Sequence, residues 1–235
     1  MKAWLVGIAA ALFLAPAAAT ADGIRLEALL GKCQQDAVGD GIWYHSAFPH
    51  TVETTSSCYA VGASAITATA GPWAFGIRAN YVDLGAITAT GIYPMNDHEF
   101  ASPPSGKDCN PRTFTGCLGK GTGTQRAYGV ALGGLVERQV GGGVTLGLEA
   151  GAYFYRGTFS IIVYPQAPSR FEPVQAHWSG LEVTPYLGLT ARWGYLMAMG
   201  RVYTRIWANE HNCEHCTGFA YGPAYQLLAG VSIPL

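Results

Sequence analysis

Residues 224–235 read Ala-Tyr-Gln-Leu-Leu-Ala-Gly-Val-Ser-Ile-Pro-Leu, and alternate side chains in this stretch differ in character. One set is apolar: Tyr225, Leu227, Ala229, Val231, Ile233 and Leu235. The other set is small or polar apart from one leucine: Ala224, Gln226, Leu228, Gly230, Ser232 and Pro234. Because successive side chains of a β-strand point to opposite faces, the stretch predicts a strand with one apolar face.

The same alternation recurs earlier in the chain from residue 57 onward, in residues 57–70, 73–81, 127–137, 144–155, 181–193 and 196–207. With a first strand near residues 42–47, these segments predict eight strands. Charged side chains fall repeatedly on the less apolar face of these strands, at Arg78, Glu149, Glu182, Arg201 and Arg205.

The composition decides which way the apolar faces point. Charged residues make up only 12% of the 235 residues and hydrophobic residues 49%. Yet beyond the first 21 residues no apolar run is long enough for a membrane-spanning helix. A water-soluble sheet would carry abundant charges on its outer face, whereas a membrane barrel turns apolar side chains towards lipid. The sequence therefore predicts an all-β fold, an eight-stranded antiparallel transmembrane β-barrel over residues 41–235. A net charge of −1 without any basic run excludes nucleic acid as a partner.

The connections between these strands alternate in length. Short turns are expected at 71–72, 139–142 and 194, and long loops at 87–124 and 158–176. Outer-membrane barrels have this asymmetry, with short periplasmic turns and long external loops.

The N-terminal segment predicts export. A basic start at Lys2, an apolar core and the small residues around Ala19 and Ala21 predict a cleaved signal peptide over residues 1–21. Residues 22–40 do not follow the strand pattern seen further on. Two interpretations stay open for them: a short helix at the periplasmic mouth, or a frayed periplasmic tail.

Together these features resemble the small, eight-stranded bacterial outer-membrane β-barrel proteins. The resemblance rests on the signal peptide, the alternating strands, the aromatic strand ends Trp73, Trp193 and Trp207, and the apolar last strand. It departs at Leu235, where such barrels typically end in an aromatic residue. The resemblance implies a Gram-negative cell envelope protein in the outer membrane, inserted by the barrel-assembly machinery and in contact with membrane lipid and lipopolysaccharide.

The charges on the less apolar faces would line a narrow barrel interior. A lone charge in that space carries a large desolvation cost, so the charged residues are expected to pair. We therefore predict an internal ion-pair cluster built from Arg78, Glu149, Glu182, Arg201 and Arg205.

Six cysteines in an exported chain favour disulfides. The shortest loops to close join Cys109 to Cys117 and Cys213 to Cys216, which leaves Cys33 and Cys58 as the remaining pair. Cys213 and Cys216 also lie beside His211 and His215, a set of donors that suits zinc or copper. A disulfide-pinned external loop is the preferred interpretation, so no cofactor is expected.

One pair of residues suggests chemistry on the lipid-facing side. His177 and Ser179 share a strand face, and their His-x-Ser spacing resembles that of lipid A deacylases. No carboxylate stands in position to orient the histidine, since Glu182 has the opposite parity. The leading hypothesis is a non-enzymatic protein, a surface binding or envelope structural module whose external loops hold an extracellular ligand. The alternatives are a narrow channel for small or apolar solutes and an esterase using His177 and Ser179.

Overall fold

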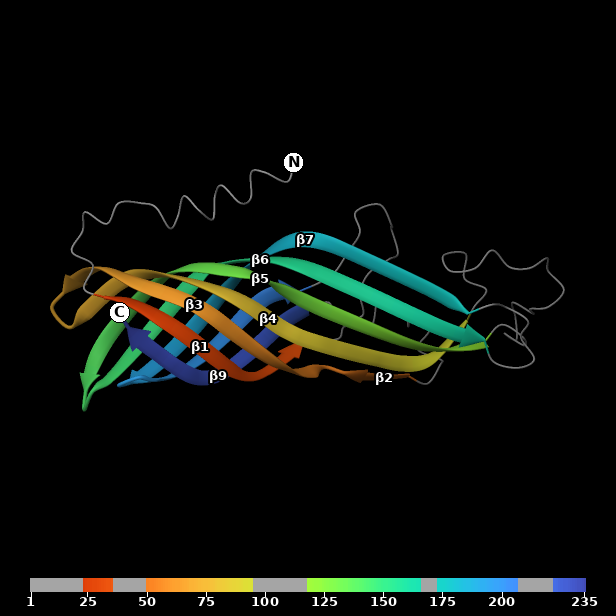
Figure 1. The fold of residues 1–235 in the computed structure, drawn as a ribbon, viewed down its shortest axis with the longest axis horizontal. Coiled ribbons are helices and arrows are strands. Elements are labelled where there is room, and N and C mark those ends of the chain that lie inside the picture. The colour runs from red at the N-terminus through yellow and green to blue at the C-terminus, as the bar shows by residue number, and fades with distance from the viewer. Residues whose placement is uncertain (1–22, 36–49, 95–117, 166–172, 207–221) are drawn as a thin grey trace.

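The computed structural model describes residues 23–35, 50–94, 118–165, 173–206 and 222–235, which form antiparallel β-strands (Figure 1). The signal peptide expected over residues 1–21 lies outside this part of the chain. The strands are β1 (Ile24–Gln35), β2 (His50–Glu53), β3 (Thr55–Ala70), β4 (Trp73–Pro94), β5 (Leu118–Gly141), β6 (Val144–Pro165), β7 (Val174–Trp193), β8 (Leu196–Ile206) and β9 (Gly222–Pro234). No helix among the described residues is both long and apolar enough to span a membrane.

Eight of the described strands close into a barrel. The hydrogen-bonded order runs β4-β3-β1-β9-β8-β7-β6-β5, and β4 also pairs with β5, which completes the ring. The short strand β2 adds to the edge of β4, where His50 lies opposite Gly91. The predicted fold, an eight-stranded antiparallel β-barrel, is confirmed.

The first strand of the barrel is β1, so both interpretations of the N-terminal segment, a short helix and a frayed tail, are wrong for Ile24–Gln35. Both edges of β1 are paired, with β3 from Ile24↔Ala65 and with β9 from Arg25↔Pro234. Its side chains alternate, with Glu27 and Leu29 buried and Leu26 and Leu30 exposed. Leaving this segment helical would leave the facing edges of β3 and β9 without backbone partners, and unpaired backbone groups are costly to bury. The strand expected near residues 42–47 lies outside the described residues.

Four neighbouring strands are longer than the sequence predicted. β4, β5, β6 and β7 have 22, 24, 22 and 20 residues, whereas β1, β8 and β9 have 12, 11 and 13. The loops expected at 87–124 and 158–176 are therefore wrong at their ends, because β4 continues to Pro94 and β6 to Pro165. Figure 1 shows these four strands projecting beyond the rest of the barrel as an open sheet.

The opposite end of the barrel carries the short turns. β3 and β4 are joined at Gly71-Pro72, β5 and β6 at Gly142-Gly143, and β7 and β8 at Gly194-Tyr195. Gly142 and Gly143 have φ of 61° and 77°, the positive pair that two-residue hairpin turns of type I′ require. Leu235 donates a backbone hydrogen bond to Ile24 at this end, which brings the C-terminus beside the start of β1. The short turns thus share one end of the barrel.

Candidate functional site

The barrel interior is crossed by a network of four charged side chains, which we call the ionic brace. Its members are Glu27 on β1, Arg78 on β4, Glu149 on β6 and Arg201 on β8. These are alternate strands of the ring, and the signs of the charges alternate around it. Arg78 bridges Glu27 at 2.9 Å and Glu149 at 2.7 Å, and Arg201 reaches Glu149 at 2.7 Å. The brace therefore ties opposite walls of the barrel together and carries no net charge.

Polar neighbours complete the hydrogen bonding of both carboxylates. Glu27 accepts from the Ser64 hydroxyl at 2.8 Å and from the Asn80 amide at 3.3 Å. Asn80 in turn accepts from Arg201 at 2.6 Å, and the Tyr186 hydroxyl donates to Glu149. Every member of the brace is at most 2% exposed. Burial of these charges is tolerated because each faces an opposite charge within a network of hydrogen bonds.

Glycines on the intervening strands make room for the brace. A Cβ at Gly133 on β5 would lie 2.5 Å from the Tyr186 hydroxyl oxygen, and one at Gly188 on β7 would lie 3.1 Å from Cγ of Arg201. Large inward side chains on alternate strands thus fit because the strands between them carry glycine, which has no side chain, at the same level. Small barrels fill their interiors in this way.

A second ionic group lies nearer the short turns. Glu137 on β5 accepts from Arg25 on β1 at 2.7 Å, and Arg192 on β7 stands 3.7 Å from the same carboxylate. Glu137 is 4% exposed, so this group closes the interior below the brace.

Aromatic side chains and a disulfide fill the interior on the other side of the brace. Tyr153 and Tyr203 have ring centroids 5.1 Å apart, and Tyr155 stacks on Tyr153 at 5.0 Å. Cys33 on β1 and Cys58 on β3 form a disulfide with a Cα–Cα distance of 5.8 Å. Cys109, Cys117, Cys213 and Cys216 lie outside the described residues. The two ionic groups and these rings together fill the interior of the barrel, which is therefore a packed core.

The structure brings three of the five predicted cluster residues together, namely Arg78, Glu149 and Arg201. Glu182 faces inward on β7, but its buried Oε1 has no hydrogen-bond partner among the described residues. Arg205 is exposed, because the pairing of β8 with β9 shifts between Tyr203 and Ile206. That irregularity reverses the parity on which the prediction for Arg205 rested.

Glu27 is the member of the brace that the sequence reasoning missed. It lies in the segment for which the sequence pattern suggests a helix or a tail, although Glu27 shares a strand face with Leu29 and Cys33. Extending the period-two test to residues 24–35 would have placed it inside.

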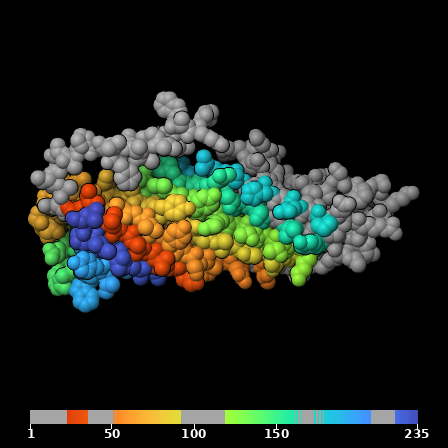
Figure 2. Space-filling view, in the orientation of Figure 1, coloured from red at the N-terminus to blue at the C-terminus, as the bar shows by residue number. Residues whose placement is uncertain are grey.

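The outer wall carries the large apolar side chains. Leu181, Leu189 and Leu227 are 70%, 67% and 69% exposed, and exposed leucine, valine, isoleucine and phenylalanine side chains occur on every strand of the ring. Figure 2 shows one side of this wall as a continuous surface of packed side chains. We call this surface the apolar belt.

Aromatic and basic residues bound the belt at both ends. At the short-turn end, Arg138 lies over the Trp73 ring at 5.1 Å, and Trp193 and Tyr195 are exposed nearby on the β7–β8 hairpin. At the other end, Arg126 lies 5.7 Å from the Tyr128 ring centroid and pairs with Asp83. Outward positions of β5 between Arg138 and Arg126 carry no charge. That stretch of strand is about 40 Å long, or about 28 Å high at a tilt near 45°.

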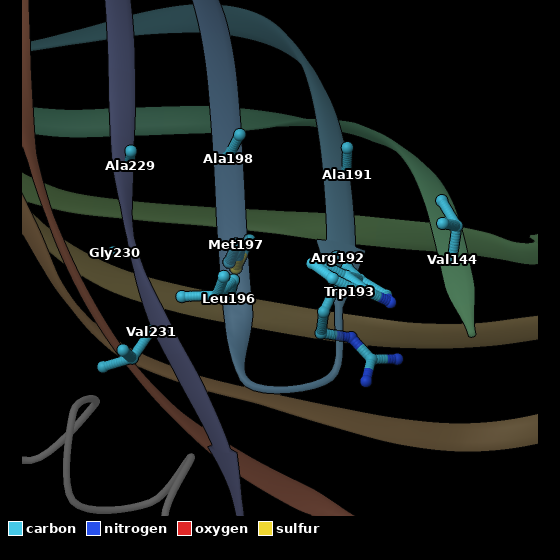
Figure 3. A pocket seen from close by; sticks show the side chains of 10 residues that line it. All are labelled: Val144, Ala191, Arg192, Trp193, Leu196, Met197, Ala198, Ala229, Gly230 and Val231. Carbon is cyan, nitrogen blue, oxygen red and sulfur yellow. The ribbon is translucent and has the colours of Figure 1, made fainter. Parts of the chain in front are cut away.

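A shallow hollow lies in the belt near the β7–β8 turn, with a volume of about 600 Å³ (Figure 3). Its floor is a cross-strand row of three alanines, Ala191, Ala198 and Ala229. Trp193 and Leu196 stand beside them and Arg192 also lines the hollow, so the lining is mainly apolar.

His177 and Ser179, the candidate catalytic pair, have no hydrogen-bonded carboxylate among the described residues. Both residues lie on the outward face of β7, with His177 exposed. The Ser179 hydroxyl accepts from Arg156 Nη2 at 2.9 Å, whereas Glu182 points to the interior. Within the described residues there is also no group of three metal-binding side chains. The metal candidates His211, Cys213, His215 and Cys216 lie outside them.

Comparisons with known proteins give a structural likeness alone. No protein-family model matches the chain, and no curated protein matches it. Among solved structures, the chain is similar to Ail, the attachment invasion locus protein of Yersinia pestis, crystallised with the heparin analogue sucrose octasulfate. The identity is 10% and the TM-score 0.37, with 90% of this chain and 99% of that chain covered.

Proposed function

We propose that this protein is a non-enzymatic β-barrel of the bacterial outer membrane, which anchors a surface binding or envelope module. The observation that carries the proposal is the inverted polarity of the barrel. The brace residues Glu27, Arg78, Glu149 and Arg201 are buried inside, while large apolar side chains cover the outside.

Water is a poor solvent for such an outer wall. Soluble monomers rarely expose contiguous apolar patches larger than a few hundred Å². The apolar belt runs around the barrel, and its height of about 28 Å is close to the lipid-facing band of about 25 Å in outer-membrane barrels. Aromatic residues at both of its borders suit the two membrane interfaces, where amphipathic rings are enriched.

Export and orientation fit the same proposal. The expected signal peptide sends the chain out of the cytoplasm into the oxidising periplasm. A Cys33–Cys58 disulfide is stable in that compartment. The short turns and the C-terminus would then face the periplasm, and the projecting sheet of β4–β7 would face outward. Lipid and lipopolysaccharide would surround the belt, after insertion by the barrel-assembly machinery.

A binding or structural role is favoured over a channel because the interior is occupied. The brace, the ionic group around Glu137 and the rings of Tyr153, Tyr155 and Tyr203 fill the cross-section at successive levels. An eight-stranded barrel has an interior only wide enough for side chains. Ligand binding is therefore proposed for the outer end, where β4–β7 carry the loops.

Heat-modifiable migration tests the proposal. The full chain is expressed in a Gram-negative host, extracted from the envelope with non-ionic detergent, and run on a gel with and without boiling. We expect membrane fractionation and faster migration of the unboiled form. Solubility without detergent, with identical migration of both samples, would contradict the proposal.

A further inference from the structure

We propose that Arg126 and Arg156 form a binding site on the outer wall for the phosphate group of a phosphorylated glycolipid of the lipid A class. The inference rests on the proposed membrane location and adds to it a specific lipid site.

The strand register places the two arginines together. Arg126 lies opposite Thr158, and Arg156 lies opposite Tyr128, on the neighbouring strands β5 and β6. The arginines are thus diagonal neighbours on one face of the sheet, at a separation of about 7–8 Å between their backbone positions. Both side chains reach from the loop end of the apolar belt, at the level where outer-leaflet headgroups would lie.

Each guanidinium is held in place by a partner that uses only part of its hydrogen-bonding capacity. Arg126 donates through Nε and Nη2 to Asp83 and lies over the Tyr128 ring. Arg156 donates through Nη2 to Ser179. Since a guanidinium has five N–H donors in a planar fork, both arginines keep donors for a further acceptor. Fixed, partly engaged guanidinium groups lose little conformational entropy when they bind an anion.

The local charge favours an anion. Asp83 offsets one of the two arginines and is itself buried by its contacts, which leaves one positive charge at this patch. A phosphate that accepts from both guanidinium groups would relieve the repulsion between them. Arginine suits this role because its fork matches phosphate geometry.

Apolar surface beside and below the arginines suits acyl chains. On the same face, Val130 is 42%, Phe154 51% and Leu181 70% exposed. Leu181 lies opposite Arg156 on β7, and Phe154 lies opposite Val130. A charged group above and an apolar wall below match a phosphorylated amphiphile better than a soluble anion.

Binding of lipid A to the purified full chain in non-ionic detergent tests the site. Diphosphorylated lipid A is titrated against the unaltered protein and against R156Q, with R126Q as a second variant. The matched control is R138Q, which removes an outward arginine that also stacks on an aromatic ring but lies at the opposite border of the belt. We expect each test variant to weaken binding about tenfold, which corresponds to one charged hydrogen-bonded contact, and the control to bind as the unaltered protein does.

Two competitors separate the sources of phosphate. Dephosphorylated lipid A should bind about as weakly to the unaltered protein as diphosphorylated lipid A binds to R156Q. Inorganic phosphate at the same concentration should not displace the lipid. Equal binding of the dephosphorylated lipid, equal displacement by inorganic phosphate, or an equal loss in R138Q would each overturn the site.

Heat-modifiable migration of every variant is measured in parallel. If the unaltered protein lacks it, the membrane barrel itself is refuted. If all variants retain it while lipid binding does not respond to Arg156, only the arginine site is refuted.

Discussion

At the scale of single residues, Glu149 holds the interior together. Its two carboxylate oxygens accept from Arg78, Arg201 and Tyr186, and its side chain is fully buried. Glu182, on the same inner face of the neighbouring strand, has a buried oxygen with no partner among the described residues. The two glutamates are therefore a natural test and control.

Glu149→Gln should lower the free energy of unfolding by about 3–5 kcal/mol, because it leaves two buried arginines without their shared counter-charge. Glu182→Gln should change it by less than about 1 kcal/mol. Urea unfolding of each variant in detergent micelles or lipid vesicles measures both values. Equal effects of the two substitutions would show that the brace is not the stabilising network.

At the scale of strands, neighbouring glycines on β5 have opposite environments. Gly133 faces the brace, where a Cβ would meet the Tyr186 hydroxyl oxygen at 2.5 Å and the Ala150 carbonyl oxygen at 2.8 Å. Gly134 faces outward with no atom within 4 Å of the same position.

Gly133→Ala should therefore destabilise the barrel by about 1–3 kcal/mol through overpacking. Gly134→Ala should be neutral or stabilising by up to about 1 kcal/mol, since it only restricts the unfolded chain. The midpoints of urea unfolding of the two variants, measured under the same conditions, test this prediction. If Gly133→Ala destabilised the barrel less than Gly134→Ala does, Gly133 would not face the interior.

The strands also show what sequence reasoning can and cannot reach. The inner faces of β4, β6 and β8 were predictable because the two faces of each strand differ strongly, and the brace residues Arg78, Glu149 and Arg201 followed from that parity. β1 was missed because Leu26, Leu29 and Leu30 fit helical spacing, whereas in the strand Leu29 points inward and the other two point outward. Arg205 was misplaced because an irregularity in pairing beyond Tyr203 leaves no mark in the local pattern.

The lengths of β4–β7 were underestimated for a related reason. Above the belt these strands carry glycine and threonine in place of large apolar residues, for example Gly121, Thr122 and Gly123. Such composition is typical of loops, yet long-range pairing with β4 and β6 holds the segment in a sheet. Tertiary pairing of this kind cannot be read from one segment alone.

At the scale of the whole molecule, a closed interior predicts that the barrel does not conduct ions. Purified protein in planar bilayers should give no resolved single-channel current, because the brace and the Glu137 group obstruct the path. A steady current that grows in Arg201→Ala would instead support a channel through the interior. Heat-modifiable migration of the same preparation must show the folded form, so that a missing current is not due to unfolded protein.

The membrane location itself is tested most directly by arginine substitutions at two depths on the outward face of β6. Ala150 lies in the middle of the apolar belt, and Ser160 lies beyond Arg156 on the same face of the same strand. If lipid surrounds the belt, Ala150→Arg lowers the free energy of unfolding in lipid vesicles by about 2–4 kcal/mol, and Ser160→Arg by about 0–1 kcal/mol. Equal and small effects at both positions would contradict the account, because a wall that faces water accepts arginine at either depth.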